Sequence, residues 1–342
     1  MSTESVCTPT PAEAEGEVAT PTTAPGELAW LVAEQERLLR FARGSRLAAG
    51  GFGWLDDRGA VDDQGPIHTW ITCRMTHVFA LAHLQGDAEA AALVDDGLAA
   101  LVGPLHDDRE GGWYTGVDQE GRPLTADKAA YTHAFVVLAA ASATAAGRPG
   151  AAELLSRALT VVERCFWSER EGALVETWDL SWLGCEAYRG ANSNMHAVEA
   201  FLAAGDVTGE PVWHERALRI AERVINRHAR AADWRLIEHF DGDWTPLYRY
   251  NEDRPDDPFR PFGATVGHWF EWARLLVGLH ASLPNPPAWL VEAAEALFAA
   301  AVRDGWQVDG APGFVYTVDW AGRPVVRSRM HWVLTEAVAA VA

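Results

Sequence analysis

Polar side chains recur near the start of several apolar segments of this sequence, and their types and spacing can support chemistry. They lie three, four or seven residues apart within each segment, so each set occupies one face of a helix. If those faces turn toward a common centre, one pocket receives an arginine, two histidines, several carboxylates, an amide and aromatic rings. The set comprises Trp70 and Arg74; Tyr131; Asn192, His196 and Glu199; His268 and Glu271; and Trp332 and Glu336.

These residue types suit proton transfer on a sugar. A histidine can remove a proton next to a carbonyl at neutral pH because its pKa lies near ambient pH. We expect His268 to be this base, with Glu271, one turn away, orienting its ring and raising its basicity. Arg74 would stabilise the developing enediolate oxygen. Aromatic rings suit the apolar faces of a sugar. The set therefore predicts metal-free isomerisation or epimerisation of an open-chain sugar.

Other chemistries fit less well. The sequence has no HxxxH or HExxH pair and no Gly-rich phosphate loop, so we expect neither a metal nor a cofactor. The single lysine, Lys128, corresponds to Arg329 in a sequence repeat, so we expect a surface cation and no Schiff base there. A glycoside hydrolase could use Glu271 and Glu336 as its carboxylate pair, but Arg74 and His268 would then have no role.

The elements that position these residues follow a repeating pattern. Long Gly/Asp-rich connections alternate with short ones, and the loop around Gly112–Pro123 closely matches the loop around Gly313–Pro324. Such repetition indicates stacked supersecondary units. Helical periodicity predicts five helix pairs. The first members span 28–47, 87–104, 150–167, 211–231 and 287–305, and the second members span 70–85, 127–146, 192–205, 265–282 and 328–341.

The two sets of helices differ in kind. The first members are amphipathic, which suits an outer layer with one solvated face, whereas the second members are apolar almost all round, which suits an inner layer. This pattern predicts an all-α fold of the α/α-barrel type. The long connections read as β-hairpin loops gathered at one end, where the inner helices begin and the polar residues lie.

Composition narrows the setting. The sequence carries 48 acidic and 28 basic residues, a net charge of −20, which argues against nucleic-acid or membrane-surface partners. No apolar run is long enough to span a membrane, and the four cysteines show no paired spacing, so we expect a cytoplasmic protein with reduced thiols. Residues 1–27 read as a disordered N-terminal tail and residues 28–342 as the barrel domain.

Three segments carry a family resemblance: Trp70–His77, Asn192–Ala200 and Gly267–Trp272. In this order they resemble the N-acylglucosamine 2-epimerase superfamily, and within it the mannose isomerases and sulfosugar isomerases. The resemblance covers residues 28–342 and implies an (α/α)6 barrel that interconverts an aldose and a ketose, such as mannose and fructose, through a cis-enediol. It implies catalysis by His268, Arg74 and Glu271, and sugar binding by Trp70, Tyr131, Asn192, His196, Trp332 and Glu336.

The sequence departs from the family pattern in one respect. The family has six helix pairs and a second catalytic histidine in the sixth, whereas five pairs are predicted here. We therefore expect a C-terminally incomplete barrel whose bared apolar flanks favour a homodimer. The expected partner is a small monosaccharide. Two alternatives stay open: a sugar 2-epimerase of the N-acylglucosamine or cellobiose type, and a non-catalytic carbohydrate-binding remnant.

Overall fold

The computed structural model describes residues 25–342, and the chain divides into two units, residues 1–41 and residues 42–342. The expected tail, residues 1–27, lies outside the described residues except for its last three, which begin helix α1 (Pro25–Ala42). On α1, Arg37 pairs with Glu34 and Arg40 with Glu36, at 2.5 and 3.9 Å. Ion pairs between side chains one turn apart stabilise an exposed helix.

The helices of the second unit match the predicted pairs within a few residues. The inner members are α2 (Thr69–Leu84), α4 (Ala130–Ala145), α6 (Ala191–Thr208), α8 (Val266–Ser282) and α10 (His331–Ala339). The outer members are α3 (Ala90–Val102), α5 (Ala151–Val161), α7 (Pro211–Ala221) and α9 (Trp289–Gly305), and a short 3-10 turn, η1 (Arg43–Ser45), follows α1. The outer helices α5 and α7 end in π-helical turns, η2 (Val162–Phe166) and η3 (Glu222–Ala229), that the periodicity did not predict.

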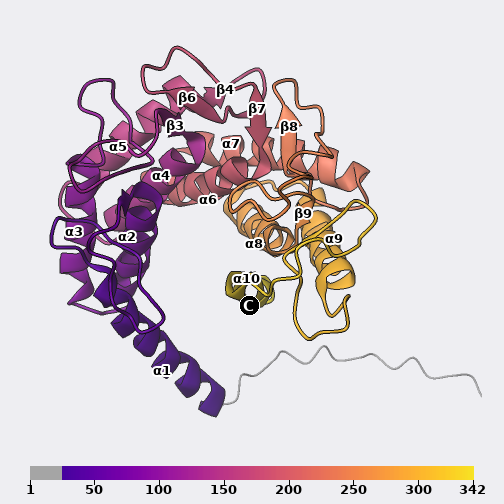
Figure 1. The fold of residues 1–342 in the computed structure, drawn as a ribbon, viewed down its shortest axis with the longest axis horizontal. Coiled ribbons are helices and arrows are strands. Elements are labelled where there is room, and N and C mark those ends of the chain that lie inside the picture. Colours follow the sequence, from indigo (N-terminus) through magenta and orange to yellow (C-terminus); the bar gives the residue numbers. More distant parts are fainter. Residues whose placement is uncertain (1–24) are drawn as a thin grey trace, which may run out of the picture. The chain divides into compact units, whose positions relative to one another are not determined.

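Within residues 42–342 the inner helices form one layer and the outer helices cover it (Figure 1). Each inner helix from α2 to α8 packs against the next inner helix and against the outer helix that follows it in the chain, and α10 packs against α8. Thirteen of the 16 residues of α4 are buried, as expected for an apolar helix with neighbours on all sides. The expected all-α architecture of inner and outer layers is therefore confirmed. No helix among the described residues combines the length and apolar character that a membrane crossing requires.

The loops at one end of the inner helices are joined across successive repeats. The antiparallel pairs are β1 (Ile67–His68) with β2 (Gly116–Val117), β3 (Asp127–Ala129) with β6 (Thr177–Asp179), β7 (Tyr188–Gly190) with β8 (His239–Asp241), and β9 (Ala264–Thr265) with β10 (Thr317–Val318). One pair, β4 (Trp167–Ser168) with β5 (Ala173–Leu174), is a local hairpin. The named strands are thus mostly ladders between loops, whereas the predicted hairpins are present as isolated antiparallel bridges within each loop, such as Val117 with Pro123 and Val318 with Pro324.

These ladders fix the start of each inner helix. The first backbone N–H groups of α2, α4, α6 and α8 donate to carbonyls in the following repeat, at 2.8–3.1 Å. The four acceptors are Thr115, Glu176, Glu238 and Tyr316. Because an N-terminal N–H has no partner within its own helix, these bonds satisfy a group that would otherwise be unpaired. Each repeat therefore anchors the N-terminal end of the inner helix before it.

A single turn design recurs in all five loops. An aspartate accepts hydrogen bonds from the backbone two and four residues later, and its carbonyl accepts one from the residue three later. The aspartates are Asp56, Asp118, Asp179, Asp241 and Asp319. The third residue after the aspartate has positive φ; it is glycine in three loops but Trp182 and Trp244 in the others, at φ of 62° and 64°. Their rings reach neighbouring loops, where each indole N–H is bonded, to Glu110 and Glu171.

The environment of Lys128 corrects one expectation. Its side chain is fully buried, and Nζ pairs with Asp107 at 2.7 Å and donates to the Gly111 and Leu180 carbonyls. The predicted surface location was wrong because the sequence gives no sign of the loop that covers it. Arg329 occupies the matching place in its own repeat and pairs with Asp309 at 2.5 Å, so the repeat relation itself holds.

Candidate active site

All nine predicted site residues line one cavity of about 500 Å³ at the N-terminal ends of the inner helices. Every inner helix contributes at least one of them, so the repeated spacing in the sequence translates into convergence in space. The lining consists of Trp70, Arg74, Tyr131, Asn192, His196, His268, Glu271, Trp332 and Glu336, together with Trp54, Pro258, Phe259, Pro261 and Tyr316, which the sequence did not indicate.

His268 forms a histidine–carboxylate dyad with a residue outside its own helix. Its Nδ1 lies 2.9 Å from Oε1 of Glu238, a buried residue just before β8. Burial alone would lower the pKa of His268, but Glu238 and, more weakly, Glu271 and Glu336 outweigh it, so the pKa is raised. The bond at Nδ1 leaves Nε2 as the nitrogen free to exchange a proton. The expectation that Glu271 orients this ring was wrong, since Glu238 does so.

Glu271 instead belongs to a cluster of carboxylates around His196. Both Glu271 and Glu199 lie 3.5 Å from Nδ1 of His196. Burial and the neighbouring carboxylates Glu199 and Glu336 raise the pKa of Glu271 to about 8. Burial lowers the pKa of His196 to about 4, against the pull of Glu199. Near neutral pH the cluster therefore holds a protonated Glu271 beside a neutral His196, and Glu271 can act as an acid.

Two arginines balance these carboxylates. Arg274 donates to Glu199 at 3.2 Å and lies 3.5 Å from Glu336. Burial would raise the pKa of Glu199, but His196 and Arg274 hold it low. Arg74 stacks its guanidinium on Phe135, 4.4 Å from the ring centroid, and lines the cavity. A permanent cation at this place can stabilise negative charge on a bound oxygen.

Aromatic rings and one amide complete the lining. Tyr131 packs edge-on against His196 with ring centroids 5.2 Å apart, and Trp332 lies 5.5 Å from His268. Phe259, more than half exposed, closes over Trp70 and Tyr131 from the loop before β9. The Asn192 amide oxygen is buried and has no hydrogen-bond partner in the described part of the chain. An unpaired acceptor of this kind is suited to a ligand hydroxyl.

A second chamber of about 600 Å³ adjoins this cavity, and the two share Trp54, Trp70, Tyr131, Asn192 and Phe259. Beyond these shared residues, its floor contains the buried carboxylate of Glu176, which bonds the Ser193 hydroxyl and the Gly190 N–H at 2.6 and 3.0 Å. The arrangement repeats that of Glu238, which accepts from the Thr265 N–H and faces His268. Ser193 therefore occupies the place in its repeat that His268 occupies two helices later.

Among the described residues, one group of donors is close enough to hold a metal ion. The ligand atoms of His196, Glu199 and Glu271 lie within 4.8 Å of one another. The same carboxylates face Arg74 and Arg274, whose charges oppose a further cation. The cluster therefore fits a shared proton better than a divalent ion.

Two polar site residues were missed, and both left a trace in the sequence. Arg274 lies three residues after Glu271 in an apolar helix, which is the same spacing rule that identified the others. Glu238 stands between Ile237 and His239 and three residues before the turn aspartate Asp241, as Glu176 does before Asp179. Comparing the repeats would have revealed it. Phe259 lies in an irregular Asp/Pro-rich loop and gave no comparable signal.

Comparison with known proteins agrees with this architecture. A D-mannose isomerase of Thermobifida fusca is 58% identical over 314 residues, which cover 92% of this chain and 77% of that protein. A D-mannose isomerase of Pseudomonas cannabina pv. alisalensis is 52% identical, covering 93% of this chain and 77% of that protein. A crystal structure of D-mannose isomerase, 28% identical, superimposes with a TM-score of 0.87 over 93% of this chain and 81% of that one.

The fold and the cavity define an α/α-barrel protein of the (α/α)6 type with its site at the loop end. A sequence model of the N-acylglucosamine 2-epimerase (GlcNAc 2-epimerase) family matches residues 50–342. The chain belongs to this family, as the resemblance of its three motifs implied.

Proposed function

We propose that the protein is an aldose–ketose isomerase that interconverts mannose and fructose without a metal. The observation that carries the proposal is the placement of the His268–Glu238 dyad, the protonated Glu271 and Arg74 around one cavity. Two relatives that are more than half identical to the chain are D-mannose isomerases, which supports this substrate.

The reaction follows from these groups. Nε2 of His268 takes the proton from C2 of the open-chain aldose, and the C–H electron pair forms the C1–C2 double bond. The carbonyl oxygen O1 receives a proton from Glu271, which gives the cis-enediol, while Arg74 stabilises the developing charge. The Glu271 carboxylate then takes the proton from O2 as the ketone forms, and His268 returns its proton to C1. No electrons are gained or lost overall.

The single His268–Glu238 dyad is sufficient for isomerisation. Moving one proton between C1 and C2 on the same face of a cis-enediol requires a single base. Epimerisation at C2 requires a second group on the opposite face. Two histidines line the cavity in the described part of the chain, and His196, with its pKa lowered to about 4 by burial, is a poor candidate for that second group.

The adjoining chamber supports a second candidate, a 2-epimerase that acts on a reducing disaccharide. Its volume of about 600 Å³ and its aromatic walls leave room for another sugar ring beyond the one beside His268. Such an enzyme would exchange the C2 proton of the disaccharide with solvent deuterium and produce no ketose.

The test combines product analysis with isotope exchange. The protein incubated with mannose in D2O should form fructose labelled at C1. His268→Ala should abolish both product and label. His83 serves as the control, because its ring Nδ1 lies 3.3 Å from the Asp87 carbonyl at the end of α2, away from the cavity. His83→Ala should therefore reduce stability while retaining turnover per folded molecule. Fructose formation by His268→Ala at the normal rate would contradict the mechanism, and label at C2 of a disaccharide without ketose would favour the epimerase.

We also propose that the protein works in the cytoplasm on a free monosaccharide, without a nucleic-acid partner, and as a homodimer. The net charge of −20 supports the lack of a nucleic-acid partner. Three apolar side chains that are each more than half exposed support the homodimer. They are Val277 on α8 and Leu334 and Val338 on α10. Sedimentation of the protein, with Leu334→Glu as the variant expected to be monomeric, tests the dimer.

A further inference from the structure

A pocket of about 440 Å³ on the outer layer has a charge opposite to that of the protein as a whole. It lies between η3, the β4–β5 hairpin and the start of α9. Four of its ten lining residues are arginines, Arg170, Arg219, Arg223 and Arg227, in a chain whose net charge is −20. No described residue lines both this pocket and the sugar cavity.

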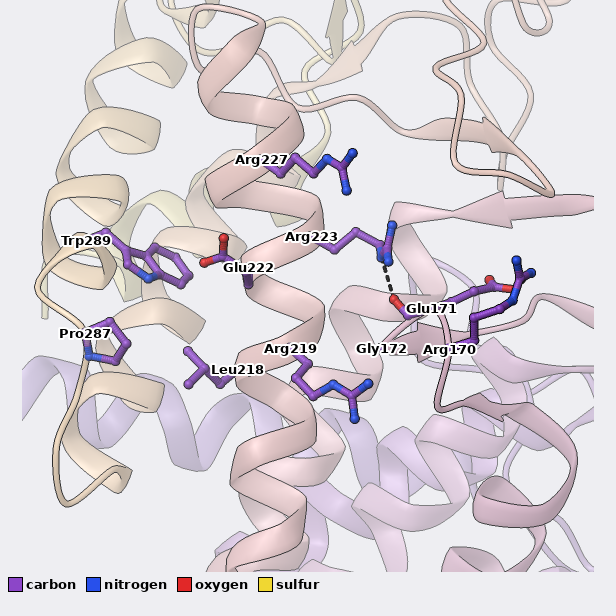
Figure 2. A pocket seen from close by; sticks show the side chains of 10 residues that line it. All are labelled: Arg170, Glu171, Gly172, Leu218, Arg219, Glu222, Arg223, Arg227, Pro287 and Trp289. Carbon is purple, nitrogen blue, oxygen red and sulfur yellow. Dashed lines mark hydrogen bonds and ion pairs between the residues drawn. The ribbon is translucent and has the colours of Figure 1, made fainter.

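Three of the arginines follow one side of a single helix. Arg219, Arg223 and Arg227 are spaced four residues apart along α7 and η3, and Figure 2 shows them pointing to the same side, toward the hairpin that carries Arg170. On the other side of the helix, Trp289, Pro287 and Leu218 form an apolar wall beside Glu222 (Figure 2). The pocket therefore has a cationic side and an apolar side.

The cationic side is incompletely neutralised. Within residues 25–342, no carboxylate lies at ion-pair distance from Arg223 or Arg227. Arg223 donates to the Glu171 backbone carbonyl at 2.6 Å and stacks on Trp244. The Glu171 carboxylate itself is buried and is bonded by Arg189 at 2.7 Å and by the Trp244 indole at 2.9 Å, with Arg170 3.2 Å away. Arg219 pairs with Glu169.

The electrostatics of Arg223 agree with this picture. Burial lowers the pKa of Arg223, and Arg227, Arg170 and Arg219 lower it further against the pull of Glu171. A guanidinium that is disfavoured by its own neighbours gains when an anion binds beside it. Guanidinium groups bind phosphate oxygens through paired N–H donors, and three of them in a row match more than one phosphate group.

We propose that this pocket binds a small molecule carrying two or more phosphate groups. Arg219, Arg223 and Arg227 contact the phosphates, and Arg170 approaches them from the hairpin. The site is independent of sugar turnover.

Isothermal titration calorimetry with inorganic pyrophosphate tests the proposal on the full chain at low ionic strength. Saturable binding is expected, weaker by about tenfold or more in Arg227→Gln and in Arg170→Gln, and weakened by salt. Both side chains are exposed, so these variants should fold, which thermal unfolding verifies. Arg58→Gln is the matched control, since Arg58 is exposed and without a carboxylate partner in the described chain but lies in another repeat.

Three results would overturn the proposal. They are an absence of heat at millimolar pyrophosphate, equal binding by the Arg227→Gln and Arg170→Gln variants and the control, and equal affinity for sulfate and pyrophosphate. A change in the oligomeric state of Arg227→Gln with no change in pyrophosphate affinity would also count against it, because the arginines would then serve a contact between chains. None of these readouts depends on isomerase activity.

Discussion

Replacing Glu238 by glutamine isolates the contribution of a single charge to catalysis. The variant keeps the size of the side chain beside His268 but removes the carboxylate that bonds Nδ1 at 2.9 Å. The amide can also present its NH2 group to Nδ1, which would place the ring proton on Nε2, the nitrogen that must accept the C2 proton. The change therefore acts on both the basicity and the tautomer of His268.

The size of the effect follows from the hydrogen bond. A bond to a charged partner contributes about 1.5–3 kcal/mol, and a pKa unit corresponds to about 1.36 kcal/mol. The pKa of His268, raised in the native protein by Glu238 against burial, should thus fall by about 1–2 units. Because the base must be unprotonated, the acid limb of the kcat/KM profile should move to lower pH by the same amount. We expect kcat to fall about tenfold to a hundredfold, with KM little changed.

The assay is fructose formation from mannose between pH 5 and 9, with Glu120→Gln as a surface control. Glu238→Gln added to His268→Ala should cause no further loss, since the carboxylate acts through the ring. An unshifted acid limb and an unchanged kcat in a folded Glu238→Gln protein would refute the dyad. So would an equal loss of activity from Glu238→Gln in the presence and absence of His268.

Three further predictions concern charge in and near the cavity. Glu271→Gln should lower kcat at least a hundredfold. It should also raise stability at pH 7 by about 1–3 kcal/mol, because the pKa of Glu271 is raised in the folded protein and ionisation in the unfolded chain opposes folding above pH 4.5. Thermal unfolding should show that this gain in stability vanishes at pH 4. Lys128→Met should cost about 3–5 kcal/mol in urea unfolding by leaving Asp107 buried without its cation. EDTA should leave mannose turnover unchanged, because the Glu199 carboxylate is already paired with Arg274. A loss of turnover in EDTA that an added divalent ion restores would refute this prediction.

The sequence predicted the helices and the convergence of the site because both follow from short-range periodicity. The spacing of His268 and Glu271 placed both on one helical face, and the cavity lies against that face. The partner of His268 was assigned incorrectly for a physical reason. Side chains one turn apart on a helix can both reach a cavity without meeting, and the nearest acceptor, Glu238, came from the long loop that precedes the helix, just before β8.

Contacts between loops account for most of what was missed. Lys128 is buried by the Leu180 carbonyl and the Trp182 ring, which come from the following repeat. Phe259 reaches Tyr131 from a loop more than a hundred residues away. No local pattern encodes such approaches. The relation between Glu176 and Glu238 was available through the repeats, however, and shows that aligning repeats recovers part of the tertiary information.

The ladders between loops have a consequence for how the cavity opens. Helices α2, α4, α6 and α8 each start with an amide bonded to the following repeat. Among the described residues, the backbone just before α10 is held only within its own loop, by bonds of Val325 and Val326 to Tyr316 and Thr317. Amides of α10 should therefore exchange with deuterium before those of the other inner helices. Trp332 and Glu336 belong to this labile wall, so a bound sugar that touches them should slow that exchange and leave α4 unaffected.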